Sequence, residues 1–172
     1  MATLRDFWPD ILVSAAKWGS RYGVSIAPEL VGAVILKENP KLDPRRVTPE
    51  PGNRRSIGLM QVLEDTAHDL GYSDARALLV PAVGIDAGTQ YLAKQLARYH
   101  GDVSSAVAAY NAGSAKFDTQ ERYVNQSYVD AVRRFYNGLI SAVKPDPFVP
   151  ESAIAGLLLA ALFVWNIYKN KR

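Results

Sequence analysis

The helical spacing of apolar residues restricts the fold of this chain more than any other feature. Apolar side chains recur every three or four residues in nearly every segment, and each segment ends at a residue typical of a helix terminus. The pattern predicts helices over residues 4–20, 28–39, about 64–70, about 82–99, 103–112 and from Ser127 onward, with a polar, Pro-rich loop over 41–55. The expected fold class is all-α, with short connections.

Several residues mark where these helices begin. Thr3 with Asp6, and Ser127 with Asp130, have the spacing of a capping box, in which each residue bonds the backbone of the other. Pro28 suits the first position of a helix, where its missing N–H does no harm. These signals agree with an all-α domain with short connections.

Composition excludes several classes of function. Residues 1–150 carry 17 Lys and Arg against 16 Asp and Glu, a net charge of +1, so the main domain is nearly neutral and gives little support to nucleic-acid binding, which uses a basic face. The chain has no Cys, and its two histidines lie far apart, which argues against zinc, thiol and Ser-His-Asp chemistry. No metal and no cofactor is expected.

Glu38 is the candidate for chemistry. It follows Val34 and Ile35 by four and three residues, so a helix would place it on the same face as buried apolar side chains, in the last turn. Desolvation and the negative end of the helix dipole would both raise its pKa, as a general acid in glycoside cleavage requires. The alternative is that Glu38 caps backbone groups or pairs with Arg45 or Arg46.

Residues 56–62 read SIGLMQV, which fits neither a strand period nor a helix, and Gly58 stands where a strand would want a side chain. Together with Glu38, four motifs resemble in order and approximate spacing those of the lytic transglycosylase family: GLMQV at 58–62, PAVGIDAGTQYL at 81–92, AAYNAG at 108–113 and SYVDAV at 127–132. The resemblance implies a lysozyme-like domain with few strands and a sugar cleft. Its substrate would be the β-1,4 bond between N-acetylmuramic acid and N-acetylglucosamine in peptidoglycan.

The resemblance also implies roles for single residues. By motif position, Glu38 is the one catalytic acid and base. Gly58, Leu59, Met60 and Gln61 would form a strand-like wall of the cleft, where Gly58 lets the backbone approach a sugar ring and the Gln61 amide bonds sugar hydroxyl and acetamido groups.

Three further residues would bind substrate or support Glu38. Tyr110 and Asn111 close a helix, and the family uses this Asn to hold an acetamido group. Tyr128 matches the Tyr whose hydroxyl points toward the catalytic Glu. Tyr123 is a rival for that role, but Tyr128 also has the capping box and the spacing to Val132.

The chain departs from the family pattern beside the catalytic position. Asn39 stands where the family has Ser, and no second carboxylate has a motif position opposite Glu38; Asp43, Glu50 and Glu64 are near only in sequence. Hydrolytic glycosidases generally use two carboxylates, whereas the family uses one Glu twice and forms a 1,6-anhydro product. We therefore expect a lyase. A lysozyme-like hydrolase is the near alternative, and a non-catalytic peptidoglycan-binding membrane protein is an alternative of another class.

The C-terminal stretch predicts a membrane anchor. An apolar run begins at Ala153, and Trp165 and Tyr168 followed by basic residues resemble an interfacial belt. The run is shorter than the roughly 20 residues that span a bilayer comfortably, and a buried core helix is the alternative. The expected organisation is an enzyme domain over 1–143, a linker over 144–152, a transmembrane helix over 153–168 and a basic tail over 169–172.

The anchor sets the expected location. The basic end would stay on the inner face, which leaves the enzyme domain facing peptidoglycan outside. Arg5, Asp6 and Asp10 interrupt any apolar core of a secretion signal at the N-terminus. A phage enzyme carried in a virion membrane, which opens the cell wall locally during entry or lysis, would need no such signal.

Overall fold

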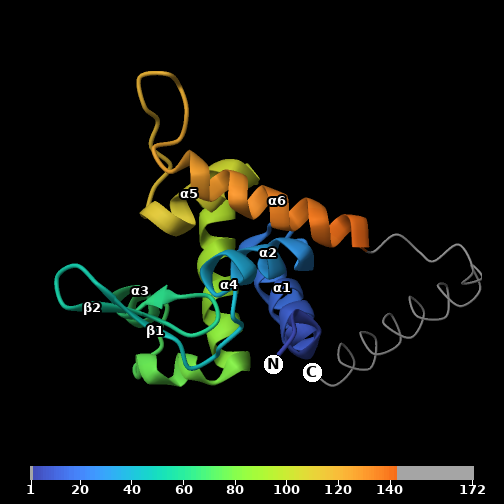
Figure 1. The fold of residues 1–172 in the computed structure, drawn as a ribbon, viewed down its shortest axis with the longest axis vertical. Helices are drawn as coiled ribbons and strands as arrows, with labels where there is room; N and C mark the ends of the chain where they lie inside the picture. The colour runs from blue at the N-terminus through green and yellow to red at the C-terminus, as the bar shows by residue number, and fades with distance from the viewer. Residues whose placement is uncertain (1, 143–172) are drawn as a thin grey trace, which may run out of the picture. The chain divides into compact units, whose positions relative to one another are not determined.

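Helix α4 (Pro81–Arg98) runs through the middle of the described residues (Figure 1). The computed structural model describes residues 2–142, and residues 1–140 form one compact unit. The other α-helices of the described part are α1 (Trp8–Tyr22), α2 (Pro28–Glu38), α3 (Glu64–Asp69), α5 (Val103–Ala112) and α6 (Gln126–Ala142). Two short 3-10 helices, η1 (Leu4–Phe7) and η2 (Ala75–Leu79), precede α1 and α4.

The predicted apolar stripe of α4 is confirmed as core. Ile85, Leu92 and Leu96 of this stripe are buried, and its last member, Tyr99, is half-buried. Helix α4 packs against both α1 and α5. Gly88 lets a neighbour approach the same helix, because a Cβ there would lie 2.4 Å from the sulfur of Met60. Helix α4 therefore packs closely against the segment around Met60.

The predicted helix ends are largely those of the structure. Helix α2 begins with Pro28 at its first position, and the Asp102 carboxylate accepts the amide of Ser105 at 2.7 Å to begin α5. Gly23 and Gly113, with φ of 65° and 75°, end α1 and α5 in the left-handed conformation that glycine adopts without strain. These local signals succeed because each satisfies backbone groups that a helix end leaves free.

The all-α expectation is wrong in one place, because the described residues include a small antiparallel sheet. Strands β1 (Val47–Glu50), β2 (Arg54–Ile57) and β3 (Val62–Leu63) pair in that order, and β1 with β2 replaces most of the predicted 41–55 loop. Gly52 and Asn53 make the turn at positive φ. The strands are short and polar, so they carry little of the alternation that identifies a strand. A helical domain with few strands, the lysozyme-like form of the expectation, agrees with the structure.

Helix α6 starts differently from the prediction. The Ser127–Asp130 capping box is wrong, since the helix begins at Gln126, whose side-chain amide donates to the Asp130 carboxylate at 3.0 Å. The helix lies across α2 (Figure 1), where a Cβ on Gly32 would lie 3.2 Å from Leu139. This crossing brings α6 to the helix that carries Glu38.

The predicted transmembrane helix over 153–168 lies outside the described residues. Among residues 2–142, no helix is long and apolar enough to cross a membrane.

Candidate active site

Glu38 is the last residue of α2 and lies at the edge of the core. Val34 and Ile35 on the same helix are fully buried, as the spacing predicts. The Tyr128 hydroxyl donates to the Glu38 carboxylate, with 2.6 Å between Oη and Oε1. Burial raises the pKa of Glu38, and this effect outweighs the hydrogen bond from Tyr128 and the nearby positive charges, which lower it. The carboxyl is thus suited to hold a proton.

The pKa of Tyr128 is also shifted. Burial, followed by the neighbouring charge of Glu38, raises the pKa of Tyr128 far above its ordinary value, so the phenol keeps its proton and remains a donor. The rival Tyr123 lies elsewhere, with its hydroxyl 2.9 Å from that of Ser105. Only Tyr128 of the two contacts Glu38 in the described structure.

Arg46 contacts the backbone of Glu38 and not its carboxylate. Its Nη1 donates to the Glu38 main-chain carbonyl at 2.6 Å, and its Nε donates to the Thr48 hydroxyl at 3.2 Å. Within residues 2–142, Glu38 forms no ion pair. The carboxylate is therefore not neutralised by an arginine, which was one alternative from the sequence.

Asn39, which replaces the Ser of the family pattern, is fully buried and is bonded on both sides of its amide. Its Nδ2 donates to the carbonyls of Asp43 at 2.6 Å and Gly58 at 3.3 Å, and its Oδ1 accepts the Asp43 amide at 3.1 Å. Asn39 thus ties the end of α2 to the segment that begins at Gly58.

Residues 58–61 form a turn between β2 and β3 rather than a strand-like wall. Gly58 has φ of 79°, and a Cβ there would lie 2.4 Å from the carbonyl oxygen of Leu78. The close neighbour that requires glycine is therefore protein backbone, not a sugar ring. The Met60 side chain is fully buried against Gly88, and its carbonyl accepts the Tyr110 hydroxyl at 2.9 Å.

The Gln61 amide is engaged within the protein. Its Oε1 accepts the Thr48 hydroxyl at 2.5 Å, and its Nε2 donates to the carbonyls of Gly58 at 2.8 Å and Arg46 at 3.3 Å. Arg46, Thr48 and Gln61 thus form a continuous network that links the hairpin, the turn and the end of α2. We call these three residues the Arg46 network.

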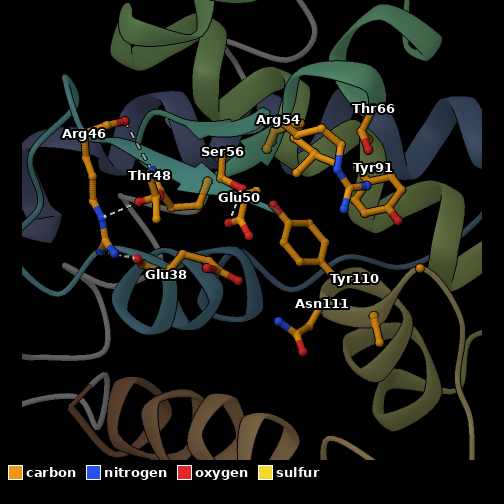
Figure 2. Close-up of a pocket in the computed structure, with 15 residues that line it drawn as sticks. Glu38, Arg46, Thr48, Glu50, Arg54, Ser56, Thr66, Tyr91, Tyr110 and Asn111 are labelled. Carbon is orange, nitrogen blue, oxygen red and sulfur yellow. Dashed lines mark hydrogen bonds between the residues drawn. The ribbon is translucent and has the colours of Figure 1, made fainter. Parts of the chain in front are cut away.

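A polar cavity of about 460 Å³ opens beside Glu38 (Figure 2). It lies between the β1–β2 hairpin and the C-terminal end of α5, with Tyr91 of α4 contributing one wall. The lining residues are Glu38, Arg46, Thr48, Glu50, Arg54, Ser56, Gln61, Val62, Leu63, Thr66, Tyr91, Tyr110, Asn111, Ala112 and Gly113. A cleft of this size, lined by polar groups and the tilted rings of Tyr91 and Tyr110, suits a carbohydrate.

The predicted site residues are distributed unevenly around this cavity. Glu38, Gln61, Tyr110 and Asn111 line it. Tyr128 reaches it only through its bond to Glu38, while Gly58 and Met60 lie behind the wall and support it.

The hairpin contributes lining residues that were not assigned from the sequence, of which Thr48, Glu50, Arg54 and Ser56 are polar. The signal that could have found them is Pro51-Gly52-Asn53, a turn sequence between two short segments. Among the carboxylates close in sequence, only Glu50 faces the cavity, where it accepts the Ser56 hydroxyl at 2.9 Å. Its negative charge adds to the raised pKa of Glu38.

The two other carboxylates have different neighbours. Asp43 accepts the amide of Arg45 at 2.9 Å in an exposed turn, and Glu64 pairs with Arg55 at 2.5 Å on the surface. Among residues 2–142, no group of three or more His, Cys, Asp or Glu side chains is arranged to hold a metal ion.

The arrangement can donate a proton to an oxygen of a bound sugar. A half-buried carboxyl with a raised pKa faces a polar cavity, and one of its oxygens is oriented by a phenol. In comparison with known protein families, the model of the transglycosylase SLT domain matches residues 14–131. The matched range contains Glu38, all of the cavity lining and Tyr128.

Proposed function

This chain belongs to the transglycosylase SLT domain family, whose members are lytic transglycosylases acting on peptidoglycan, and from that premise we propose that it is a lyase of the glycan strand. The bond cleaved is the β-1,4 linkage between N-acetylmuramic acid and N-acetylglucosamine. The product is 1,6-anhydro-N-acetylmuramic acid. The observation that carries this proposal is the half-buried Glu38 carboxyl in the cavity, with a raised pKa and a bond from Tyr128.

The proton cycle needs only Glu38. The protonated carboxyl gives its proton to the glycosidic oxygen while the bond from that oxygen to C1 of the muramic residue breaks. The resulting carboxylate then takes the proton of the C6 hydroxyl as O6 bonds to C1, which restores the acid. Because Tyr128 engages Oε1, Oε2 is the oxygen that exchanges the proton. The attack is intramolecular, so its entropic cost is low.

A hydrolase is the second candidate, and Glu50 is the reason to keep it. Glu50 lines the same cavity as Glu38, and a second carboxylate could activate water for attack at C1. Its bond from Ser56 and its position on the hairpin are equally consistent with a carboxylate that only stabilises positive charge at C1. The products distinguish the two reactions.

The test is a digest of purified sacculi in water enriched in oxygen-18, analysed by mass spectrometry. The lyase releases muropeptides that lack one water, carry no heavy oxygen at the new end and resist borohydride reduction. The hydrolase releases reducing muropeptides that carry one heavy oxygen. If reducing products dominate and disappear in Glu50→Gln, the lyase proposal is wrong and Glu50 is the base. Binding of sacculi with no release at all would favour the non-catalytic alternative.

We also propose that the apolar run over 153–168 anchors the enzyme to a membrane, with the catalytic domain facing peptidoglycan. This proposal rests on the sequence alone: an apolar run bounded by Trp165, Tyr168 and basic residues. A virion membrane of a phage is one setting that would bring such an enzyme to the cell wall.

A further inference from the structure

The orientation of the Asn111 amide is fixed by another residue. Asn111 is exposed at the C-terminal end of α5, and its Oδ1 accepts a hydrogen bond from Nδ2 of Asn125 at 2.9 Å. Because the oxygen is used in this way, the NH2 group is the part of the amide left for the cavity. Figure 2 shows the nitrogen of Asn111 on the side of Glu38 and the oxygen turned away from it.

Asn125 itself cannot be turned around. Its Nδ2 also donates to the main-chain carbonyl of Ala108 at 3.0 Å, and a carbonyl only accepts hydrogen bonds. A rotated Asn125 would place its oxygen against that of Ala108, so the Ala108 carbonyl fixes Asn125, and Asn125 fixes Asn111. The main-chain carbonyl of Asn125 also accepts the amide of Tyr128 at 2.9 Å, which holds the residue at the start of α6.

One feature of Asn125 lowers the stability of the folded protein. Its Oδ1 is buried and has no hydrogen-bond partner in the described structure. A buried acceptor without a partner destabilises a fold, and native proteins contain few of them. This loss of stability is offset by the NH2 group of the same amide, whose two hydrogens are donated to the Ala108 carbonyl and to Oδ1 of Asn111.

We propose that Asn125 is a positioning residue that makes the cleft present a hydrogen-bond donor at Asn111, and so selects a substrate group that accepts. The inference rests on the proposed function, in which the bound chain is peptidoglycan glycan. In such a chain, the acetamido carbonyl is the strongest acceptor apart from carboxylates. Loss of Asn125 frees the Asn111 amide to rotate and to present its oxygen, which repels that carbonyl.

The experiment compares Asn125→Ala with wild type on soluble, uncrosslinked glycan strands before and after de-N-acetylation. Wild type should prefer the acetylated strands. In Asn125→Ala, KM for acetylated strands should rise by between about two- and about tenfold, the effect of one neutral hydrogen bond, while KM for de-N-acetylated strands changes little. Gln120→Ala is the control, because Gln120 lies in the same segment before α6 and donates a hydrogen bond to Asp118 through its backbone amide, which the substitution keeps.

Equal losses on both substrates, with the preference for acetylated strands unchanged, would mean that Asn125 only supports α6, and the proposal would be overturned. If Asn125→Ala does not fold, Asn111→Asp replaces it. One oxygen of that carboxylate still accepts from Asn125, so the melting temperature should hold while the preference for acetylated strands is lost. A preserved preference in Asn111→Asp would equally overturn the proposal.

A readout without activity separates this inference from the proposed function. In nitrogen-15-labelled protein, both Nδ2 protons of Asn125 should exchange slowly with water, because both are donated. Asn111→Ala should accelerate the exchange of one of them. Unchanged exchange would contradict the hydrogen bond, whatever the enzyme does to peptidoglycan; an inactive wild type with the expected exchange would contradict only the function.

Discussion

Arg46 holds the main-chain carbonyl of Glu38 at 2.6 Å while Tyr128 holds its carboxylate, also at 2.6 Å. The contact with Arg46 positions the end of α2, and the contact with Tyr128 orients the carboxyl group. A guanidinium on the carboxylate would favour its charged form and lower its pKa strongly. The Arg46 guanidinium on the carbonyl fixes the end of α2 and lowers the pKa of Glu38 only through its charge, an effect that burial outweighs.

Glu38→Gln should abolish the release of muropeptides from sacculi. The variant keeps the size of the side chain and an acceptor for Tyr128, but it cannot donate or take a proton. General acid–base catalysis contributes about 10²- to 10⁴-fold, so a loss of at least about 100-fold is expected. Glu29→Gln, at the opposite end of α2, is the matched control. Near wild-type release by the folded variant would exclude Glu38 as the acid.

The same variant should become more heat-stable than wild type as the pH rises. Burial raises the pKa of Glu38 above its ordinary 4.5, so the native state binds the proton more tightly than the unfolded state. The stability that this proton contributes is complete below about pH 4.5 and is lost as the pH rises through the raised pKa. The melting-temperature difference between Glu38→Gln and wild type should therefore grow from pH 4.5 upward, and a constant difference would argue against a raised pKa.

Tyr128→Phe should move the pH profile of kcat/KM. The phenol stabilises the ionised carboxylate, so its removal raises the pKa of Glu38 further. The alkaline limb, where the acid loses its proton, should shift to higher pH, and kcat at the optimum should fall by about tenfold or more as the carboxyl loses its orientation. Tyr123→Phe, which removes a hydroxyl beside Ser105, should leave the limb in place.

Arg46→Ala should lower kcat more than it changes KM, because the network positions Glu38. Loss of a hydrogen bond from a charged donor costs about 1.5–3 kcal/mol, so the free energy of unfolding should fall by that amount. Arg46→Lys should not restore activity, since a single ammonium cannot hold both the Glu38 carbonyl and the Thr48 hydroxyl in the geometry of a guanidinium. Arg45→Ala, at an exposed position, is the control. Full activity in Arg46→Lys would mean that Arg46 acts only through its charge and not through the geometry of its hydrogen bonds.

Gly58→Ala should destabilise the protein more than Gly71→Ala. Both glycines have positive φ, which costs an alanine about 1–2 kcal/mol, but a Cβ at Gly71 meets nothing within 4 Å, whereas one at Gly58 collides with the Leu78 carbonyl. Overpacking typically adds about 1–3 kcal/mol. Chemical denaturation measures the difference. Equal losses of stability in the two variants would mean that Leu78 does not restrict position 58. The expected approach of Gly58 to a sugar ring would then again explain the glycine.

Removal of residues 151–172 should release the enzyme from membranes without loss of activity on purified sacculi. Every residue that lines the cavity lies between Glu38 and Gly113, well before the removed segment. Sedimentation with lipid vesicles measures the first effect and muropeptide release the second. If the shortened chain unfolds or aggregates, the segment belongs to the core and the anchor proposal fails.

The helices and the position of Glu38 could be predicted because they follow from local rules. Pro28, Asp102 and Gly113 each satisfy or remove a backbone group at a helix end, and Val34 and Ile35 set the face on which Glu38 lies. The start of α6 was missed because Gln126, rather than Ser127, bonds both Asp130 and the backbone amide of Tyr123 before the helix.

The hairpin side of the site could not be predicted in the same way. Strand β1 contains a proline and polar residues, and its pairing with β2 depends on main-chain hydrogen bonds rather than on an apolar pattern. The neighbours of Gly58, Met60 and Gln61 within the protein could not be predicted for a related reason. Their partners, Leu78, Gly88 and Thr48, are distant in sequence or belong to the missed hairpin, so spacing could not reveal them.

The turn over residues 58–61 has a consequence for altering the enzyme. Gln61 of this turn lines the cavity, while Gly58 and Met60 pack against η2, α4 and α5, so a change made there to admit a new substrate would also disturb folding. The hairpin tip is different, because Arg54 lines the cavity from an exposed position and its side chain bonds only the Pro51 carbonyl within the described residues. Directed evolution of substrate range should therefore accumulate its tolerated changes at the tip, and leave the turn untouched.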